Sequence, residues 1–249
     1  MPSDDTAVRL VVCLPTYQER ENLEPMVRAL REVFRDAGLD GARVVVADDN
    51  SPDGTGEVAD RLADQFPWLT VLHRERKEGL GPAYVAAFRR ALADGADLVV
   101  EMDCDFSHDP GDVPRLVAAA READVVLGSR YVPGGRIENW GPGRRWVSRA
   151  GSWYGRAVLG LGVRDLTGGF KCFRRTVLET IDLDALTAQG YTFQIETTFR
   201  AVRAGFRVME IPITFVDREV GGSKMTKRIV AEAMWRVPLL RLGALRRRR

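Results

Sequence analysis

The chain has little cysteine and contains no long apolar run. Its three cysteines, Cys13, Cys104 and Cys172, are odd in number and far apart among 249 residues. This pattern disfavours a disulfide framework or a zinc cluster and favours a protein kept reduced in the cytosol. No apolar stretch approaches the roughly twenty residues of a membrane-spanning helix, and the acidic start carries no apolar signal core. We therefore expect a cytoplasmic chain that does not cross a membrane.

The chain also has almost no net charge. The 37 basic and 35 acidic residues nearly cancel, so bulk charge gives no reason to predict a nucleic-acid partner. The distribution is uneven, because five of the last nine residues are arginines. The length fits one large α/β domain or two small ones, and no internal repeat is evident.

Apolar strands and amphipathic helices alternate in the first half of the chain. β-branched apolar runs predict strands at residues 8–14, 43–47, 69–73, 97–102 and 124–127. Helical periodicity predicts helices at residues 23–37, 56–66, 82–94 and 113–123. We expect an α/β fold with a Rossmann-like, mostly parallel sheet covered by helices on both faces. Such sheets bind ligands beyond the carboxyl ends of their strands, where this chain gathers polar residues.

Asp103 and Asp105 stand directly after the strand predicted at residues 97–102. Residues two apart in an extended segment point to the same side, so both carboxylates can reach one cation. Oxygen ligands of this kind suit Mg²⁺ or Mn²⁺ carrying phosphates. Aspartates also terminate strands and cap helices, so the spacing alone leaves a purely structural alternative.

Further polar residues follow the first two strands. Tyr17 either covers the core or stacks its ring on a nucleobase. Asp48 and Asp49 are adjacent carboxylates that repel each other, which favours a base-reading or ribose-reading role for one of them. The Pro-Asp-Gly turn at residues 52–54 fits a structural role and a binding role equally.

The two histidines receive different interpretations. His108 follows the paired carboxylates and is either a metal ligand or a structural residue. Neutral imidazole matches magnesium less well than oxygen does, which favours the structural interpretation. His73, at the end of the third predicted strand, is expected to be structural.

The polar segments at these strand ends form a recognisable combination. Pro-Thr-Tyr-x-Glu-x-x-Asn spans residues 15–22, Asp-Asp-x-Ser-x-Asp-Gly-Thr spans residues 48–55, and Asp-x-Asp spans residues 103–105. Together they resemble the large inverting glycosyltransferase family with the GT-A fold. The resemblance covers residues 8–130 and implies a nucleotide-sugar donor, but it leaves the acceptor open.

The second half of the chain is similar to the dolichol-phosphate mannose synthases and their bacterial polyprenol-phosphate counterparts. The matching segments lie at residues 128–131, 144–149, 165–171, 190–196, 211–218 and 223–224. This resemblance implies an enzyme that transfers mannose from GDP-mannose to a polyprenyl monophosphate. We accordingly assign residues 1–224 to a catalytic domain.

Site residues follow from the same resemblance, position by position. Those implied to bind the nucleotide sugar are Pro15, Tyr17, Glu19, Ala47, Asp49, Asp103, Cys104, Asp105, Arg130, Arg218 and Lys224. The implied metal ligands are Asp103, Asp105 and Ser107. The implied acceptor-phosphate ligands are Arg130, Arg144 and Ser148. Catalysis is assigned to Asp103, Asp105, Arg130, Arg218 and Lys224.

Two positions depart from the family pattern. Ser107 stands where some relatives carry glutamine and others serine, so the third metal ligand there is a hydroxyl, a water or absent. Cys104 stands where alanine is usual, and a thiol between two metal ligands would be open to oxidation.

Charge supports a phosphate acceptor independently of the resemblance. Transfer to a hydroxyl needs a general base, whereas a lipid monophosphate is already anionic near neutral pH. The protein must then hold two anions within bonding distance, which requires cations. Arginines supply them in one segment, at Arg130, Arg144, Arg145 and Arg149, with Ser148 on the helical face of Arg144. A solvated helix face is the alternative interpretation of these arginines.

The mechanism that we expect is a single in-line displacement. The acceptor phosphate oxygen attacks the anomeric carbon of GDP-α-mannose opposite the nucleotide, which inverts the configuration. A divalent metal, with Arg218 and Lys224, stabilises the departing GDP. The alternatives are another donor such as UDP-glucose on the same fold, and a non-catalytic subunit of a membrane glycosylation complex.

The segment at residues 225–249 is amphipathic and basic. A helix is predicted at residues 229–245. Its apolar anchors, which lie beside arginines, are Trp235, Leu239, Leu240 and Leu242. This pattern predicts an interfacial helix, and hence a peripheral location on the cytoplasmic face of a membrane. A separate integral membrane partner is compatible with that location. Docking of the helix on the core is the alternative. A second apolar helix is predicted at residues 151–162.

Overall fold

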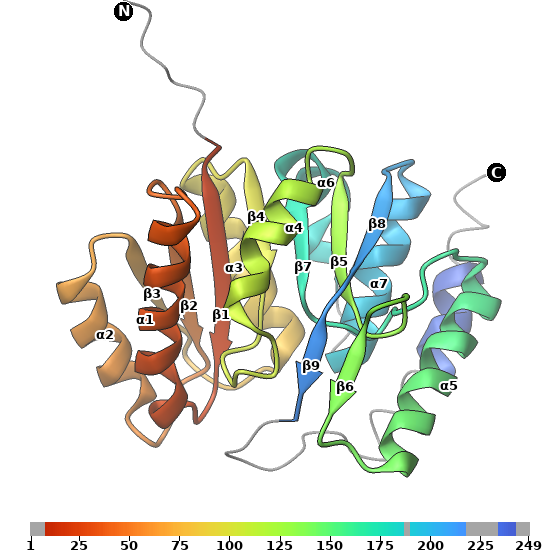
Figure 1. Ribbon diagram of the computed structural model, residues 1–249, viewed down its shortest axis with the longest axis horizontal. Coiled ribbons are helices and arrows are strands. Elements are labelled where there is room, and N and C mark those ends of the chain that lie inside the picture. The colour runs from red at the N-terminus through yellow and green to blue at the C-terminus, as the bar shows by residue number, and fades with distance from the viewer. Residues whose placement is uncertain (1–7, 187–189, 218–233, 243–249) are drawn as a thin grey trace, which may run out of the picture.

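The computed structural model describes residues 8–186, 190–217 and 234–242 of the chain. Within these residues, seven strands form one sheet in the order β3-β2-β1-β4-β7-β5-β8, with helices on both faces (Figure 1). Its strands are β1 (Leu10–Thr16), β2 (Arg43–Asp48), β3 (Leu69–His73), β4 (Leu98–Glu101), β5 (Val125–Ser129), β7 (Lys171–Arg174) and β8 (Val208–Pro212). β6 (Arg136–Glu138) and β9 (Thr214–Val216) pair in a separate small sheet.

The large sheet is parallel except for β7. β7 runs antiparallel to β4 on one side and to β5 on the other, and it separates these two strands. The other neighbours pair in parallel. The expectation of a mostly parallel sheet is therefore confirmed, and the five predicted strands correspond to β1 to β5 within a few residues. The pairing of β6 to β9 was not predicted.

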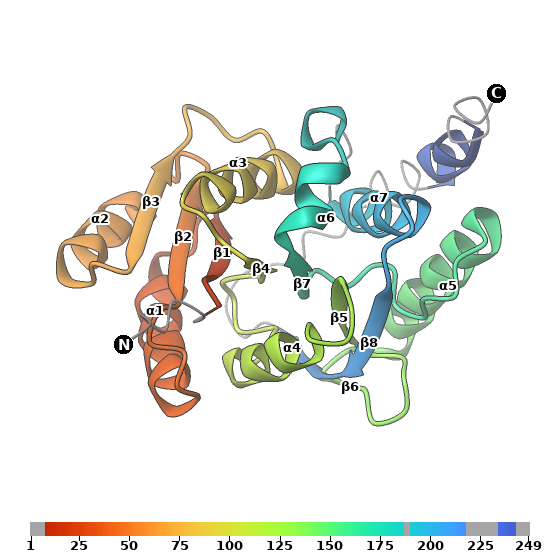
Figure 2. The same cartoon turned by 90° about the horizontal axis from the view of Figure 1, so that it is seen from above.

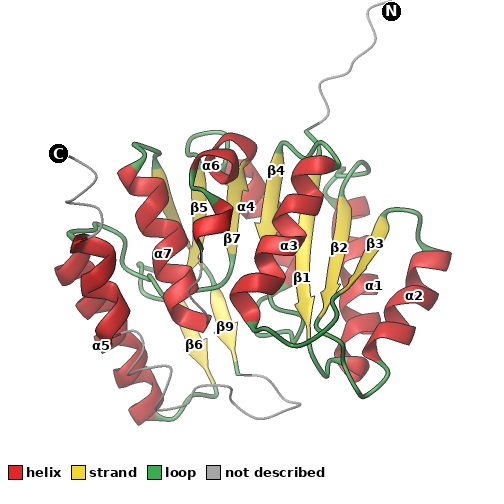
Figure 3. Cartoon of the chain, turned by 180° about the vertical axis from the view of Figure 1, so that it is seen from behind, coloured by secondary structure: helices red, strands yellow, loops and turns green. Residues whose placement is uncertain are grey.

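Helices cover the sheet in two layers, as the views from above and from behind show (Figures 2 and 3). One layer holds α1 (Arg20–Asp36), α2 (Thr55–Gln65) and α4 (Val113–Ala119). The other holds α3 (Leu80–Ala93), α6 (Arg175–Thr180) and α7 (Gly190–Arg203). Because both faces are covered, β1 is apolar along its length: Leu10, Val12 and Leu14 face the first layer, and Val11 and Cys13 face the second.

α5 (Pro142–Leu159) stands outside these layers at one end of the molecule. It begins nine residues earlier than the helix predicted at residues 151–162 and ends slightly before it. Pro142 is favourable at the first helical position, where its missing N–H costs nothing. Gly160, with a φ of 69°, ends the helix in the left-handed conformation that glycine tolerates.

A terminal helix at residues 234–242 lies against α5. The Tyr154 hydroxyl on α5 donates to the Met234 carbonyl at 2.9 Å, and Val237 is fully buried. One face of this helix therefore docks on the core, as one of the two interpretations predicted. Trp235, Leu239 and Leu242 on its other side are exposed. None of the described helices is long and apolar enough to span a membrane.

Candidate active site

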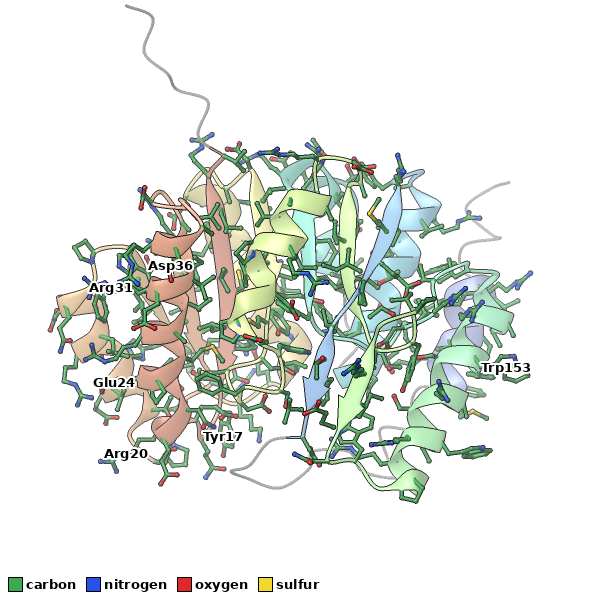
Figure 4. The ribbon with its side chains drawn as sticks, in the orientation of Figure 1. Tyr17, Arg20, Glu24, Arg31, Asp36 and Trp153 are labelled. Carbon is green, nitrogen blue, oxygen red and sulfur yellow. The ribbon has the colours of Figure 1, made fainter. Side chains whose placement is uncertain are left out.

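The polar segments after β1, β2, β4 and β5 meet at one edge of the sheet, at the bottom of Figure 1. Parallel pairing sets Thr16 of β1 opposite Asp48 of β2, which places the two following loops side by side. Figure 4 shows Tyr17 at this lower end of β1. The Lys77 ammonium lies over the Tyr17 ring, 3.5 Å from the ring centroid. These loops therefore gather at the edge of the sheet where the sequence predicts the site.

Asp48 and Asp49 point to different partners, which resolves their repulsion. Asp48 accepts hydrogen bonds from the Thr16 hydroxyl at 3.0 Å and from the backbone N–H and hydroxyl of Ser51. These bonds give Asp48 a structural role in the loop. Asp49 pairs with the half-buried Arg74 and accepts from the Gly79 backbone N–H, so it lies toward α3.

The segments around Glu19 and Asp53 hold each other in place. The Glu19 backbone N–H donates to the Thr55 hydroxyl at 3.1 Å, and Asn22 donates to the Glu19 carboxylate at 2.7 Å. Asp53 accepts from both the backbone N–H and the hydroxyl of Thr55, at 3.1 and 2.6 Å. Gly54, with a φ of 89°, makes the turn into α2. The structural interpretation of the turn at residues 52–54 accounts for these bonds.

The carboxylates Asp103 and Asp105 occupy the loop that follows β4. Asp103 is half-buried and accepts a hydrogen bond from the Tyr84 hydroxyl of α3 at 3.2 Å. Asp105 is buried and accepts from the Ser107 backbone N–H at 3.1 Å, which tightens the loop. Cys104, between them, is buried in the core layer of α1 and α4. The thiol is therefore shielded from solvent rather than exposed to oxidants.

His108 is a buried component of this loop. Its ring stacks on Phe170 with the ring centroids 5.0 Å apart, and it meets Phe215 of β9 edge-on. Its Nδ1 accepts a long hydrogen bond of 3.4 Å from the Asp103 backbone N–H. Burial lowers the pKa of His108 to about 4, although the nearby Asp105 opposes that shift. The ring is neutral at pH 7, and these contacts favour the structural interpretation.

A buried ion pair lies beneath the carboxylate loop. Glu101, the last residue of β4, faces Lys171 of β7 across the antiparallel pair at 3.2 Å, and both side chains are fully buried. Lys171 also donates to the backbone carbonyl and side-chain oxygen of Gln194 and to the Thr197 hydroxyl of α7. These bonds connect α7 to β7 and, through Glu101, to β4, the strand that precedes Asp103.

Arg130 is held by a second buried ion pair. Its Nε and Nη2 donate to the two oxygens of Asp165 at 2.7 Å each, and Nη2 also donates to the Thr167 hydroxyl. Burial alone would raise the pKa of Asp165, but the charge and hydrogen bonds of Arg130 outweigh burial and lower it. The Arg130 charge is thus compensated within the protein, and its predicted role toward phosphate stays a prediction.

Arg144 and Arg130 lie on the same aromatic residue. Trp140 is buried, and its ring centroid lies 4.1 Å from the Arg144 guanidinium carbon and 5.5 Å from that of Arg130. Arg144 Nη1 donates to both oxygens of Asp217 at 2.7 Å. Among the described residues, nothing accepts a hydrogen bond from Arg144 Nε or from Trp140 Nε1. A bound anion would supply the acceptors that these two buried donors lack among the described residues.

Ser148 lies one turn after Arg144 on α5, as predicted, but it contacts a different group. The Tyr131 hydroxyl donates to Ser148 Oγ at 2.7 Å, and the Tyr131 ring lies within 5.4 Å of the Arg149 guanidinium carbon. Tyr131 and Trp140 together gather the predicted acceptor residues. Arg145, in contrast, is exposed and donates to the Ile137 carbonyl. The remaining predictions for Arg218 and Lys224 lie outside the described residues.

The residues present fit a divalent cation bound with phosphates. No group of three or more His, Cys, Asp or Glu side chains within the described part of the chain could hold a metal ion by itself. Asp103, Asp105 and the Ser107 hydroxyl supply a small set of hard oxygen donors instead. Mg²⁺ is commonly held in this way, by one or two carboxylates with phosphate and water completing its shell.

Three contributors were missed in the sequence. Arg74 pairs with Asp49, Asp165 pairs with Arg130, and Tyr84 donates to Asp103. Asp165 and Arg130 both lie in segments that resemble the family, so opposite charges in two such segments were the available signal. Arg74 and Tyr84 gave none, because an arginine after a strand and a tyrosine on the apolar face of a helix have ordinary structural roles.

Comparison with known proteins agrees with this geometry. Residues 11–182 match glycosyl transferase family 2. The undecaprenyl-phosphate mannosyltransferase of Micrococcus luteus is 48% identical over 237 residues, which cover 95% of this chain and 96% of that protein. The polyprenol monophosphomannose synthase of Mycolicibacterium smegmatis is 47% identical over 232 residues, which cover 92% of this chain and 85% of that protein.

Two solved structures share the fold at low identity. Glucosyl-3-phosphoglycerate synthase from Mycobacterium tuberculosis matches with a TM-score of 0.65 at 20% identity, over 95% of this chain and 80% of that chain. A mannosyltransferase from Pyrobaculum calidifontis, in complex with GDP-Man and Mn²⁺, matches with a TM-score of 0.56 at 19% identity, over 95% and 73%. The family match covers more than half of the chain, so the protein is a glycosyltransferase that belongs to glycosyl transferase family 2 and has the GT-A fold.

Proposed function

We propose that the protein transfers mannose from GDP-mannose to a polyprenyl monophosphate with inversion, giving polyprenyl β-mannosyl phosphate and GDP. The observation that carries this proposal is the 48% identity, over nearly the whole of both chains, to a relative named for mannosyl transfer to undecaprenyl phosphate. A divalent cation, Mg²⁺ or Mn²⁺, belongs to the proposal as the partner of Asp103, Asp105 and Ser107.

The acceptor side is supported by the donors around Trp140. Arg144 Nε and Trp140 Nε1 are buried and lack an acceptor among the described residues, and the Arg144 guanidinium lies against the Trp140 ring. A phosphate monoester carries several strong acceptor oxygens and matches the forked geometry of arginine. We assign the acceptor phosphate to this position, with Ser148 and Arg130 beside it.

The ion pairs of the site argue for an acceptor that needs no general base. Asp165 and Asp217 lie near the proposed acceptor, and each is held by an arginine. Arg130 lowers the pKa of Asp165 against the effect of burial, which makes it a weak proton acceptor. A hydroxyl acceptor would need a better base, whereas a phosphate oxygen attacks as an anion.

On the donor side, the loop that carries Asp103 and Asp105 would hold the diphosphate of the nucleotide sugar. Tyr17, Glu19 and Asp49 lie on the first two loops and are assigned to the nucleoside, with Pro15 near the end of β1 and Ala47 near the end of β2. The cation supplies charge stabilisation for the leaving diphosphate when it is bound. Arg218 and Lys224 are assigned to the same leaving group. Holding donor and acceptor in line then supplies the orientation that the displacement requires.

A lipid-extraction assay tests the donor and acceptor together. The purified protein is incubated with radiolabelled GDP-mannose or UDP-glucose and with polyprenyl phosphate or the unphosphorylated polyprenol. We expect label in the organic phase only with GDP-mannose and polyprenyl phosphate, and a β-anomeric product by NMR. Preferential labelling from UDP-glucose, or labelling of the free alcohol, would overturn the proposal.

Asp105→Ala tests the metal assignment within the same assay. Removing one carboxylate ligand should abolish turnover even at saturating Mn²⁺, because electrostatic stabilisation of the leaving group contributes several kcal/mol of barrier lowering. Circular dichroism of the variant checks that it is folded. Full activity would return this aspartate to a structural role in the loop.

The proposal also places the protein peripherally on the cytoplasmic face of a membrane, where its lipid acceptor lies. Trp146 and Trp153 of α5 and Trp235 of the terminal helix are 72%, 69% and 72% exposed. Figure 4 shows Trp153 at the outer side of α5. Exposed tryptophans with arginines nearby are typical of surfaces that enter the lipid headgroup region.

Vesicle co-sedimentation tests this surface. We expect the wild-type protein to sediment with vesicles rich in anionic lipid and the double variant Trp146→Ser, Trp153→Ser to sediment less. Arg31→Ala, on α1 at the other end of the molecule, serves as the control variant. Equal sedimentation of all three proteins would contradict the membrane surface and leave a separate integral membrane partner as the means of attachment.

A further inference from the structure

Tyr84 is a fully buried tyrosine in the second turn of α3. Its ring stacks on Phe193 of α7 with the centroids 5.9 Å apart and the planes inclined by 4°. It also stacks on Phe88, one turn further along α3, at 5.7 Å and 27°. Two aromatic neighbours from two helices therefore hold the ring in one orientation, so the position of its hydroxyl is set by packing.

The Tyr84 hydroxyl contacts the loop that carries Asp103 and Asp105. It donates to Asp103 Oδ1 at 3.2 Å, across 19 residues of sequence. Packing alone would be served by phenylalanine, which carries the same ring. The hydroxyl adds one directed hydrogen bond, and its acceptor is a predicted metal ligand rather than a backbone carbonyl.

α3 also contacts the neighbouring loop of the site. The backbone N–H of Gly79, which precedes the first residue of α3, donates to Asp49 at 3.4 Å. Asp49 is assigned to the nucleoside and Asp103 to the metal, so one helix makes a contact with each. The position of α3 thereby relates the two parts of the donor site to each other.

We infer that Tyr84 is a positioning residue that fixes the Asp103 carboxylate in the orientation needed to bind a divalent cation. The inference rests on the metal site included in the proposed function. A hydrogen bond to one oxygen of a ligating carboxylate restricts rotation of the group and directs the other oxygen. Partners of metal ligands that act in this way typically contribute about 10- to 100-fold to metal affinity or activity.

The test measures Mn²⁺ binding directly, by electron paramagnetic resonance of unbound Mn²⁺, with and without GDP. Tyr84→Phe retains the ring and both stacking contacts and removes only the hydroxyl. We expect the Mn²⁺ dissociation constant to rise about 10-fold or more, while the melting temperature shows that the fold is retained. Tyr154→Phe is the control, because it also removes one tyrosine hydroxyl and its single hydrogen bond, the exposed one to the Met234 carbonyl. Its Mn²⁺ affinity should equal that of the wild type.

A double-mutant cycle separates the inference from the metal assignment. Asp103→Ala should weaken Mn²⁺ binding by itself, and adding Tyr84→Phe to that variant should have no further effect, because the hydroxyl acts through Asp103. If Asp103→Ala weakens binding but Tyr84→Phe does not, Tyr84 is only a core residue and the metal site stands. If neither change affects Mn²⁺ affinity, the metal assignment and the inference both fail.

Discussion

Two arginine–aspartate pairs lie beside Trp140, and they differ in burial. In the Arg130–Asp165 pair the side chains are 3% and 0% exposed, and two nitrogens of the arginine meet two oxygens of the aspartate. In the Arg144–Asp217 pair the side chains are 19% and 27% exposed, and a single nitrogen of Arg144 makes both contacts. In the first pair, Nε and Nη2 of the arginine donate to protein oxygens, whereas the second leaves Nε of its arginine without an acceptor among the described residues.

This difference indicates that the two pairs have different roles, one in stability and one in ligand binding. A buried arginine whose hydrogen bonds go to protein atoms anchors the segment after β5 and organises the ring of Trp140. A partly exposed arginine with an unused N–H donor can bind a ligand at a lower desolvation free energy, because its charge is already partly solvated. We therefore expect Arg130–Asp165 to act mainly on stability and Arg144–Asp217 mainly on acceptor binding.

The largest expected effect is that of Asp165→Asn on stability. The variant leaves the Arg130 guanidinium buried without its counter-charge, which should lower the free energy of unfolding by about 3–5 kcal/mol. Asp217→Asn is the matched change in the more exposed pair and should cost about 1 kcal/mol or less. Urea denaturation of both variants measures the contrast. Equal losses would show that the difference in burial does not separate the two pairs.

Arg144→Ala should have the next largest effect, on acceptor binding. Loss of charge-assisted hydrogen bonds worth about 1.5–3 kcal/mol should raise the KM for polyprenyl phosphate by about 10- to 100-fold and leave the KM for GDP-mannose unchanged. Arg145→Ala, at the exposed neighbouring position, is the control. An unchanged lipid KM in Arg144→Ala would assign this arginine to the protein surface.

Trp140→Phe should have a smaller effect on the same parameter. The variant retains an aromatic ring under both guanidinium groups and removes the buried Nε1 donor. Loss of one neutral hydrogen bond to the acceptor phosphate should raise the lipid KM by about 2- to 10-fold. An unchanged lipid KM in the folded variant would mean that the indole N–H does not face the acceptor.

The smallest expected effect is on the pH dependence of stability. The pKa of Asp165 is lowered in the folded protein, because Arg130 outweighs burial. The unfolded state therefore binds more protons as the pH falls toward the ordinary carboxyl pKa, and the contribution of the pair is lost as the pH falls through the folded pKa. Between about pH 5 and about pH 3, the wild type should lose more unfolding free energy than Asp165→Asn, by at most about 1.4 kcal/mol per pH unit. Parallel curves would contradict this assignment.

The first half of the fold was predictable because its signals are local. The strands β1 to β5 are short apolar runs that end in polar segments, and α1 to α3 have the helical period. The carboxyl ends of parallel strands meet at one edge whatever their exact order, so the location of the site followed as well. The motifs at residues 15–22, 48–55 and 103–105 indicated the family, and the match over residues 11–182 confirmed it.

The second half was less predictable because its strands depend on distant partners. β7 is four residues long, and β6 and β9 are three each. Runs this short carry little periodicity. β7 enters the sheet antiparallel between β4 and β5, and this placement is decided by pairing with strands far away in the sequence.

The sequence by itself determined the fold class, the family and the edge of the sheet at which the polar residues gather. Only the tertiary structure decided which charges pair. Arg130 and Asp165 are 35 residues apart, Arg144 and Asp217 are 73 apart, and Tyr84 and Asp103 are 19 apart. Apolar periodicity is a property of neighbouring residues and can be recognised in the chain. An ion pair or a directed hydrogen bond depends on the three-dimensional positions of two side chains, which exist only once the strands and helices have packed.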